Sequence, residues 1–451
     1  MINNITLKTF VHGENCYLYC PFPNKLIRIS KEHYSEIKFL ERYGLDCYLK
    51  LEKESQAYKD IVVLIQKKVI VESPIKRIEH PLTNYVEPLL DRGLNFLILQ
   101  VTKDCNFSCR YCLFASKSSD NLKLNHQSNY MSFDTARRSV DFLYNHSQDA
   151  KELMISFYGG EPLLNFDLIR QTVEYAKKIF VSKKFKFGMT TNASLLNETM
   201  INFFIEHNFY LTISLDGDPQ TQNCHRKFYA NGYDTFDIVW NNVQTIRKIN
   251  NDYFISHVVF HPVIFVDEDN DKVMGFFQSN GISNDMVSIQ YANTQGIDYT
   301  FNGVFRENIE KKSIPISDFK KMEETLKSNL PILVNWHHSG PCVPGALRLY
   351  VDIAGNFFPC EKTCSLVSIG NLDQGFCIQN VKDMLNIGKL TSDNCKHCWA
   401  VRFCSLCVSQ CVDLGTNKID KGVKTWNCSK QKDNVIKFFK EYIDKTMDYS
   451  L

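Results

Sequence analysis

The residues with the clearest chemical potential are three cysteines in the stretch KDCNFSCRYC. Cys105, Cys109 and Cys112 follow a C-x3-C-x2-C spacing and come directly after a predicted strand. Three thiolates in one short loop can bind three irons of a four-iron cluster and leave the fourth iron open to another ligand. A structural zinc ion usually takes four ligands, and no fourth Cys or close His accompanies this loop. The spacing therefore favours an iron–sulfur cluster with one open iron.

A second group of cysteines lies near the C-terminus, where ten of the seventeen cysteines follow residue 340. The first part of the pattern is a Cys, twelve residues and then G-x4-C, beginning at Gly355. The second part is C-x2-C-x5-C, followed by a more distant Cys. The cysteines of this pattern are Cys342, Cys360, Cys395, Cys398, Cys404 and Cys428. The closely spaced ones are also compatible with zinc, so metal identity stays open on spacing alone.

Composition decides how these thiols are interpreted. The chain has 451 residues, 44% of them apolar, and its formal net charge is +2. The length predicts two or three domains, and the small charge argues against a nucleic-acid partner. The chain shows neither a run of membrane-spanning length nor an N-terminal secretory signal, so we expect a cytoplasmic protein without membrane contact. Disulfides do not persist in the cytosol, so most cysteines should be metal ligands or core residues.

Between residues 95 and 292, apolar stretches of strand type alternate with amphipathic helical stretches. Six strands are expected, at 95–101, 152–158, 184–190, 209–215, 255–265 and 286–292. Their β-branched and aromatic residues are typical of buried strands. Strands that alternate with helices predict parallel pairing. The sequence therefore predicts an α/β fold with a partial, TIM-like (β/α)6 barrel over residues 95–310.

The first four strands each end in an unusual polar or glycine-rich stretch. Strand one is followed by the cysteines, and strand two by Gly159, Gly160 and Glu161. Strand three ends in a Thr-Thr-Asn run that closes with Asn192, and strand four in the SLDG motif, which contains Ser214 and Asp216. Because the carboxyl ends of parallel barrel strands share one rim, these stretches should converge on one site.

The regions outside the barrel are expected to form two further domains. Residues 1–80 are expected to form two strands, then two helices and then a closing strand, and this order predicts a winged-helix module. Prolines punctuate the segment that follows, and 81–94 is interpreted as a linker. Residues 311–451 are Cys-rich and poorly periodic, so bound metal should hold their loops in place.

The CNFSCRYC, YGGEP, TTN and SLDG motifs together closely resemble those of the radical S-adenosylmethionine (SAM) superfamily, over roughly residues 95–310. The resemblance implies that SAM chelates the open iron and that its reductive cleavage frees a 5′-deoxyadenosyl radical. It further implies that SAM contacts Gly159, Gly160 and Glu161 at its methionine end and Ser214 and Asp216 at its ribose. Asn192 and Arg226 complete the implied SAM site; Arg226 could reach the carboxylate or could be an ordinary loop charge.

The C-terminal cysteines resemble the SPASM extension of radical SAM enzymes, over about residues 335–435. That resemblance implies two auxiliary four-iron clusters, so the chain would carry three [4Fe-4S] clusters in all. The implied ligands of the outer cluster are Cys395, Cys398, Cys404 and Cys428. Cys342 and Cys360 are implied for the inner one.

One position departs from the SPASM pattern. The family expects a Cys four residues after Cys404, but this chain has Val408 there, flanked by Cys407 and Cys411. Cys407 is the preferred inner ligand, and Cys411 and Cys364 stay open as alternatives. An inner cluster with an open iron is also compatible with the pattern.

Two further roles follow from resemblance to peptide-modifying enzymes. Glu361, directly after Cys360, would be the base that takes a proton from substrate, although a loop carboxylate that caps a turn is the alternative. The N-terminal module would bind an extended leader peptide at a sheet edge near Tyr17–Tyr19 and Leu26–Ile29. A dimerisation or capping domain is the alternative.

The expected function is a radical SAM peptide maturase that installs a cross-link, most simply a Cys thioether, in a ribosomally made precursor peptide. Its partners would be that precursor and an external one-electron reductant such as ferredoxin or flavodoxin. Anaerobic sulfatase maturation, carbon–carbon cross-linking and peptide epimerisation stay open as enzymatic alternatives. A zinc-stabilised peptide-binding module is the non-enzymatic one. Neither the peptide, the bond nor the oligomeric state follows from the sequence.

Overall fold

The chain forms two compact units that do not follow the order of the sequence. The computed structural model describes residues 5–51, 53–67, 70, 72–112, 129–181, 183–265, 270–291, 335–336, 342–363, 368–413, 416 and 418–447. The first unit comprises 1–84, 301–342 and 383–451, and the second comprises 85–300 and 343–382. Both ends of the chain therefore belong to one unit, although the sequence predicted separate N-terminal and C-terminal domains.

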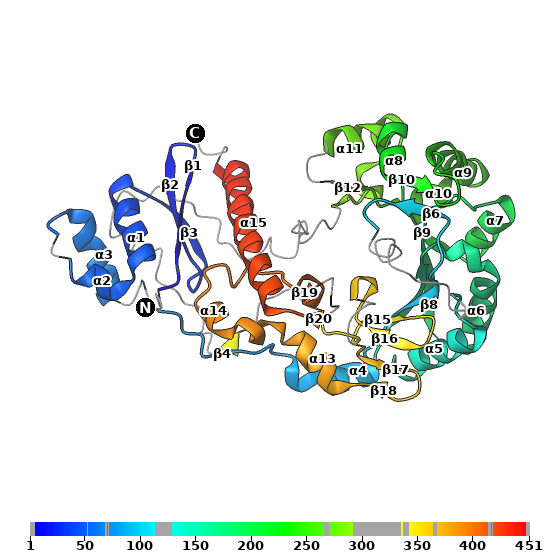
Figure 1. Cartoon of the computed structure of the whole chain (residues 1–451), viewed down its shortest axis with the longest axis horizontal. Helices are drawn as coiled ribbons and strands as arrows, with labels where there is room; N and C mark the ends of the chain where they lie inside the picture. Colours follow the sequence, from blue (N-terminus) through cyan, green and yellow to red (C-terminus); the bar gives the residue numbers. More distant parts are fainter. Residues whose placement is uncertain are drawn as a thin grey trace. The chain divides into compact units, whose positions relative to one another are not determined.

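A sheet in the second unit forms the core of the fold, in the order β11-β9-β8-β7-β5-β15-β16-β17-β18 (Figure 1). Neighbours from β11 to β15 pair in parallel, which confirms the predicted parallel α/β core. These strands are β5 (Phe96–Thr102), β7 (Glu152–Gly159), β8 (Lys184–Thr191), β9 (Phe209–Ile213), β11 (Val258–Phe260) and β15 (Arg348–Val351). The helices between them are α5 (Phe133–Asn145), α6 (Phe166–Ile179), α7 (Glu198–Glu206), α8 (Pro219–His225), α9 (Phe236–Ile249) and α10 (Asn251–His257).

The two faces of this sheet differ in polarity. Residues on one face, such as Leu99, Phe157 and Leu211, are completely or almost completely buried. The register places polar side chains on the opposite face, named the polar face here: Gln100, Ser156, Tyr158, Thr190, Thr212 and Ser214. The last two residues of that set are half-buried. β5 is buried from Leu97 to Thr102, as the sequence predicted, whereas β9 alternates between buried and more exposed residues. The polar face also carries the buried apolar residues Ile98 and Tyr350.

The sixth expected strand is much shorter than predicted. Only β13 (Gln290–Tyr291) has strand structure there, and it pairs in parallel with β12 (Val263–Ile264). Val287 forms a single parallel bridge with Phe260 at the end of β11. Pro262 separates β11 from β12, and a proline has no N–H to donate to a strand ladder. The edge of the sheet is therefore interrupted where the sequence predicted a continuous barrel strand.

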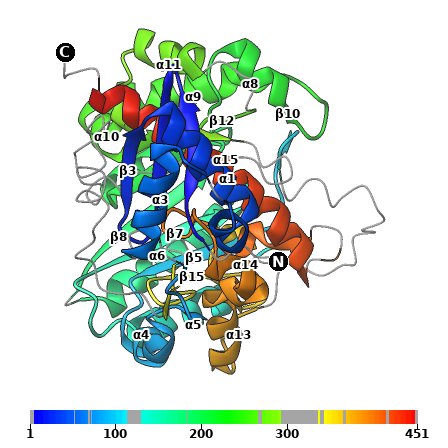
Figure 2. The same ribbon diagram turned by 90° about the vertical axis from the view of Figure 1, so that its left-hand side faces the viewer.

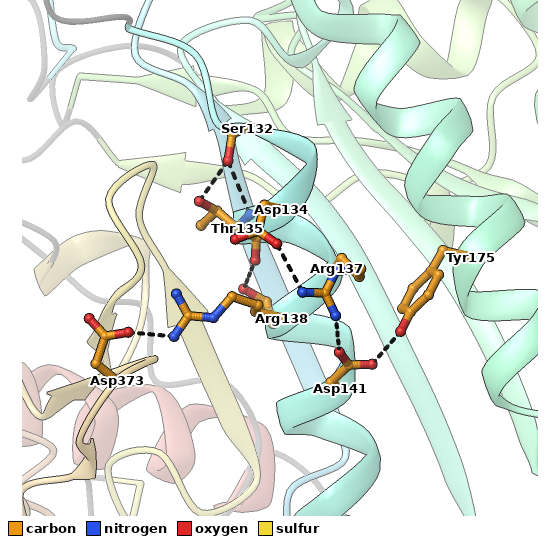
Figure 3. A network of polar contacts seen from close by, with 9 residues as sticks. Ser132, Asp134, Thr135, Arg137, Arg138, Asp141, Tyr175 and Asp373 are labelled. Carbon is orange, nitrogen blue, oxygen red and sulfur yellow. Dashed lines mark hydrogen bonds and ion pairs between the residues drawn. The ribbon is translucent and has the colours of Figure 1, made fainter.

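The sheet continues beyond β5 through residues that the sequence assigned to the C-terminal domain. β15 forms a hairpin with β16 (Asn356–Phe358), followed by β17 (Gly370–Asn371) and β18 (Gly375–Phe376). Figure 3 shows how α5 is held beside this extension: Arg138 forms an ion pair with Asp373, in the turn between β17 and β18. On the same helix, Asp141 accepts hydrogen bonds from Arg137 at 2.9 Å and from Tyr175 of α6 at 2.6 Å.

The first unit contains a small antiparallel sheet with the order β1-β2-β3, of which the sequence predicted the last two strands but not β1. Its strands are β1 (Lys8–His12), β2 (Asn15–Cys20) and β3 (Lys25–Ile29), and the helices that follow are α1 (Lys31–Tyr43), α2 (Leu45–Leu49) and α3 (Gln56–Gln66). Because β2 is the central strand, Tyr17–Tyr19 cannot offer a free edge. That part of the prediction was wrong, whereas Leu26–Ile29 lies on the edge strand β3. Residues 69 and 71 of the expected closing strand 69–73 lie outside the described residues, and Glu72 forms an antiparallel bridge with Ile5.

A long helix from the other end of the chain covers the second face of this small sheet. α15 (Lys421–Met447) packs Val435, Phe439 and Ile443 against Phe10 and Tyr19. The opposite face packs on α1 and α3 through residues such as Leu18 and Ile61. Figures 1 and 2 show α15 on one side of the sheet and the two helices on the other. The sequence did not predict α15.

The remaining helices and strands are short. The expected linker 81–94 is partly helical, with a 3-10 turn at Thr83–Tyr85 and α4 (Val86–Arg92), whose Pro88 lies in the first turn, where proline is tolerated. The others are β4 (Arg77–Ile78), β14 (Asn335–Trp336), α11 (Asn270–Ser279), α13 (Ile378–Leu385), α14 (Ser392–Lys396), β19 (Val412–Asp413) and β20 (Lys418–Ile419). Within the described part of the chain, no helix combines the length and apolar character that a membrane span needs.

Candidate iron–sulfur and cofactor site

The loop of the first three cysteines begins where β5 ends. The ladder between β5 and β7 shifts register between Gln100 and Thr102, and such an irregularity redirects a strand. The loop then forms β6 (Phe107–Cys109), which pairs antiparallel with β10 (Arg226–Phe228), so that Cys109 lies opposite Arg226. The backbone N–H of Cys112 donates to the Cys109 carbonyl oxygen at 3.0 Å. A short ribbon therefore supports all three thiols at the carboxyl end of the sheet.

The thiols of this loop are partly withdrawn from water. Burial raises the pKa of Cys105 to about 12 and that of Cys109 to about 11. Iron binds thiolates, so ligation has to release these protons, and the positive charge of the metal supplies the driving force. The loop thus suits a bound cluster better than a free nucleophilic cysteine, which would need a lowered pKa.

Gly159 and Gly160 bring the end of β7 against the start of the cysteine loop. A Cβ atom on Gly159 would lie 2.2 Å from the carbonyl oxygen of Thr102, and one on Gly160 would lie 2.1 Å from that of Asp104. The Gly160 N–H donates to the Thr102 oxygen at 3.0 Å. Gly159 also has φ +145°, in the region that favours glycine. Only glycine fits at both positions.

Glu161 connects the ends of β7 and β8 from inside the protein. Its fully buried carboxylate accepts hydrogen bonds from the Thr191 hydroxyl and from the Asn192 backbone N–H, each at 2.7 Å. It also accepts one from the Leu163 N–H at 3.1 Å. Burial raises the pKa of Glu161 to about 7, while these donors act in the opposite direction. In this arrangement Glu161 is a structural link between two strand ends.

Asn192 contacts the cysteine loop directly. Its side-chain amide donates to Asn106 at 2.9 Å, and Asn106 in turn donates to the Ser194 hydroxyl at 2.9 Å. The Ser194 hydroxyl closes the set by donating to the Asn192 oxygen at 2.7 Å. Because Asn106 follows Cys105, this small network holds the cysteine loop against the end of β8.

Asp216 and Arg226 form a buried ion pair next to the cysteine loop. Both oxygens of Asp216 accept hydrogen bonds from Arg226 at 2.9 Å. One oxygen also accepts from the Tyr111 hydroxyl at 2.6 Å, and the other from the Val263 N–H at 2.8 Å. Asp216 is 0% exposed. Both residues therefore hold Tyr111 in place, and Arg226 also acts on the Cys109 thiol opposite it; the SAM contacts expected for them stay predictions.

Ser214 is placed differently from Asp216. Its backbone N–H donates to the Thr191 carbonyl oxygen at 2.9 Å, and its side chain lies half-buried on the polar face. A hydroxyl at this position faces the same side of the sheet as Thr212 and Thr190. Ser214 thus keeps the accessibility that a ribose contact requires.

The four cysteines predicted for the outer cluster lie together in the first unit. Cys395, Cys398, Cys404 and Cys428 line one pocket. They come from α14, the loop after it, and α15, which explains how a distant Cys joins the set. Burial raises the pKa of Cys398 to about 11 and also raises that of Cys404 and Cys428.

The spacing of donor side chains bears on which metal could bind. Within the described ranges, no three His, Cys, Asp or Glu side chains lie close enough together for one metal ion. In a four-iron cluster each thiolate binds its own iron, so the ligands stand farther apart than those of a single ion. The metal that the cysteine pocket binds stays a prediction.

The predicted ligands of the inner cluster are divided between the units. Cys360 belongs to the second unit and exposed Cys342 to the first. Cys364 lies outside the described residues. Cys411 is fully buried and its thiol donates to the Cys407 carbonyl oxygen at 3.3 Å, whereas Cys407 is half-buried. Of the two, Cys407 has the more accessible sulfur.

Glu361 begins the short 3-10 turn that follows β16. Its carboxylate stands 3.6 Å from the Arg348 guanidinium, which lies over the Phe96 ring. Phe96 pairs with Arg348 at the first residue of β5, whereas Cys105 follows the last. The seven residues of β5 span roughly 20 Å at about 3.3 Å per residue. The Glu361 carboxylate also acts on His261, which directly follows β11 at the carboxyl end of the sheet, where it opposes the lowering of the His261 pKa by burial. Glu361 is therefore not confined to the amino end of β5.

Several residues that shape the site were not singled out from the sequence. Asn106 has a weak signal, its position inside the cysteine motif. Arg348 and the buried Lys424 have none, because their neighbours come from distant parts of the chain. Only the folded chain brings such pairs together.

Comparisons with known proteins match mainly the part of the chain that holds the cysteine loop and the parallel sheet. Residues 99–276 match the family model of the radical SAM superfamily. An uncharacterized protein of Methanocaldococcus jannaschii is 36% identical over 28% of this chain and 40% of its own length. The radical SAM cyclopropyl synthase TigE of Paramaledivibacter caminithermalis is 22% identical over 69% of this chain and 67% of its own length. A cysteine-type anaerobic sulfatase-maturating enzyme of Clostridium novyi is 28% identical over 42% and 48%, respectively.

Solved structures show the same fold. Native anSMEcpe with bound AdoMet superposes with a TM-score of 0.52 at 19% identity, over 79% of this chain and 99% of that one. The same enzyme with bound AdoMet and the Kp18Cys peptide gives equal values. At this identity the likeness concerns the fold. The first two curated relatives are matched over 40% and 67% of their own lengths, so their activities do not transfer directly.

Proposed function

Residues 99–276 of this chain belong to the radical SAM superfamily, and from this premise we propose that the protein is a peptide maturase that installs a Cys thioether cross-link. The observation that carries the proposal is the cysteine loop, held by three separate networks at the carboxyl end of the parallel sheet. A loop fixed in one conformation suits a cluster that has to present one open iron to SAM.

The SAM site would use the residues nearest the cysteine loop. When bound there, a reduced four-iron cluster and SAM supply a 5′-deoxyadenosyl radical that removes a hydrogen atom from the substrate. Cys105, Cys109 and Cys112 would be its protein ligands, and the glycine backbone of β7 would face the methionine end. Ser214 would hydrogen-bond the ribose, with Asp216 and Arg226 acting indirectly by holding Tyr111.

Glu361 is proposed as the base that takes the proton of a substrate thiol. The Glu361 carboxylate forms an ion pair with the Arg348 guanidinium at 3.6 Å, which fixes its position. Cross-linking removes one hydrogen as an atom and the other as this proton, together with one electron. The auxiliary clusters, with Cys360 and Cys407 among the inner ligands and the pocket cysteines as the outer ones, would accept that electron.

The N-terminal part of the first unit is proposed as a winged-helix leader-recognition domain. Its edge strand β3 would pair with an extended leader, because an edge strand keeps unpaired backbone groups. β2 is enclosed, and β1 is the other edge. Relatives support a peptide substrate: a structure of anSMEcpe contains a bound peptide, and TigE is named a cyclopropyl synthase. A ferredoxin or flavodoxin would supply the electron for SAM cleavage.

The proposal can be tested with the purified full chain under anoxic conditions. The protein is incubated with SAM, a chemical reductant and Cys-containing precursor peptides encoded near its gene, and the peptides are analysed by mass spectrometry. We expect a mass lower by two hydrogen atoms per link and loss of free thiol. The Cys105→Ala, Cys109→Ala, Cys112→Ala triple variant should cleave no SAM.

Sulfatase maturation is the second candidate, favoured by the 28% identity with the cysteine-type enzyme of Clostridium novyi. In the same assay a sulfatase peptide would then gain an aldehyde at its Cys, while precursor peptides would keep their mass. That result would replace cross-linking by formylglycine formation. SAM cleavage that persists in the triple variant would instead show that the primary site is elsewhere.

A further inference from the structure

A lysine in the cysteine pocket of the first unit has an unusual environment. Lys424, on α15, is 0% exposed. Its ammonium donates to the Thr391 hydroxyl and to the Cys395 sulfur, the latter at 3.7 Å. Among the residues that the structure describes, no carboxylate pairs with it. An ammonium group buried without a compensating anion costs several kcal/mol in general, so its position requires a source of negative charge nearby.

The pocket itself supplies that charge only if its cysteines hold a metal cluster. Besides the four cysteines, Lys424 and Lys432 line it, and none of the described lining residues is acidic. The Lys424 ammonium lies 3.7 Å from the sulfur of one of these cysteines, Cys395. Four thiolates outweigh the positive iron–sulfur core, so the cluster that fits here is an anion. Two cations around four cysteines match such an occupant.

We propose that Lys424 raises the reduction potential of the outer auxiliary cluster, which makes that cluster the better electron acceptor. The inference rests on the outer cluster of the proposed function. Reduction adds one electron, and hence one negative charge, to a group that is already anionic. A fixed positive charge beside a ligand sulfur stabilises the reduced form more than the oxidised form, most strongly where water is excluded. Lys432 has the same sign of effect but is half-buried, so solvent screens it more.

The test compares midpoint potentials in the reconstituted full chain. Lys424→Met removes the charge and keeps a similar volume, and Lys421→Met, at an exposed position of the same helix, is the matched control. The outer-cluster signal is defined as the one lost when Cys395 and Cys398 are both replaced by Ala. Titration followed by electron paramagnetic resonance should show the equilibrium constant for reduction at least tenfold lower in Lys424→Met, a fall of about 59 mV for one electron. The control should match the parent protein.

Each other outcome counts against the inference in a separate way. An unchanged midpoint potential in Lys424→Met, with full iron content, overturns it while leaving the cross-linking proposal intact. If Lys424→Met fails to retain the outer cluster, Lys432→Met is measured instead, and a smaller fall is expected; no fall overturns the inference. If the double Ala variant loses no iron, the outer cluster itself is absent. That result contradicts the cofactor part of the proposed function independently of the potential.

Discussion

At the scale of single residues, the motif at the end of β7 stabilises the fold through contacts with neighbouring strand ends. Gly160 lets two backbones approach so closely that a Cβ atom would stand 2.1 Å from the Asp104 oxygen. Both carboxylate oxygens of Glu161 accept hydrogen bonds from the end of β8 and from the turn that follows β7. The YGGEP motif is therefore a joint between two strand ends, and it sets the position from which the cysteine loop starts.

Replacing Gly160 by Ala should damage this joint. The added methyl group meets backbone oxygen, which cannot move aside, so we expect a loss of about 1–3 kcal/mol or more in unfolding free energy. Gly275, inside α11, provides the control, because a Cβ atom added there would meet nothing within 4 Å. Gly275→Ala should leave stability unchanged or raise it by up to ~1 kcal/mol. Thermal unfolding of both variants checks this, and equal melting temperatures would contradict it.

The raised pKa of Glu161 predicts a pH dependence of stability in the metal-free protein. Its pKa in the folded protein is about 7, above its ordinary value of 4.5. The folded state therefore binds the proton more tightly, so this contribution to stability is complete below pH 4.5 and is lost as the pH rises through 7. Denaturant unfolding from pH 5 to 8 should show the decline, on the order of 2–3 kcal/mol. Glu161→Gln should remove it; an identical decline in that variant would assign the effect to another group.

At the scale of elements, the ribbon of β6 and β10 joins the cysteine loop to the end of β9. Its stability depends on the buried pair of Asp216 and Arg226, which also fixes Tyr111 between two of the cysteines. A loop of this length would otherwise have many conformations. Holding it in one of them before iron arrives lowers the entropic cost of assembling the cluster.

Breaking the pair from one side should therefore be severe. Asp216→Asn leaves Arg226 buried without its counter-charge, which costs about 3–5 kcal/mol. Tyr111→Phe keeps the pair and loses one hydrogen bond to a charged group, about 1.5–3 kcal/mol. Iron content and melting temperature should fall in both variants, and further in Asp216→Asn. A larger loss in Tyr111→Phe would mean that the tyrosine has a direct role at the cluster.

At the scale of the whole molecule, the two ends of the chain form one unit. The ring of Phe439 in α15 lies 4.7 Å from that of Tyr19 and 5.2 Å from that of Phe403, centroid to centroid, so the N-terminal sheet and the cysteine pocket share a core. Cys428 lies on the same helix. The strands proposed for leader recognition and the cysteines proposed for the outer cluster thus pack on the same helix, α15.

This connection predicts that the N-terminal sheet cannot be removed without damage to the cysteine pocket. Deletion of residues 1–70 exposes the apolar face of α15, and we expect iron bound by the outer site to be lost. Phe439→Ala should weaken the same core by about 3–5 kcal/mol, and Phe438→Ala, which is only partly buried, by less. Iron analysis and thermal unfolding test both. A truncated chain with full iron content would show independent domains instead.

The sequence alone was sufficient for the features that depend on local pattern. Cysteine spacing, glycines at strand ends and the alternation of strands and helices are local patterns in short stretches, and they predicted the parallel core and the superfamily. The metal ligands of the cysteine loop stay a prediction. What only the tertiary structure decided depends on residues far apart in the chain. Asp216 pairs with Arg226, α15 covers the N-terminal sheet, and Lys424 is buried beside Cys395. The reason is physical: a side chain's partners are set by packing, and periodicity shows which face is buried but not what covers it.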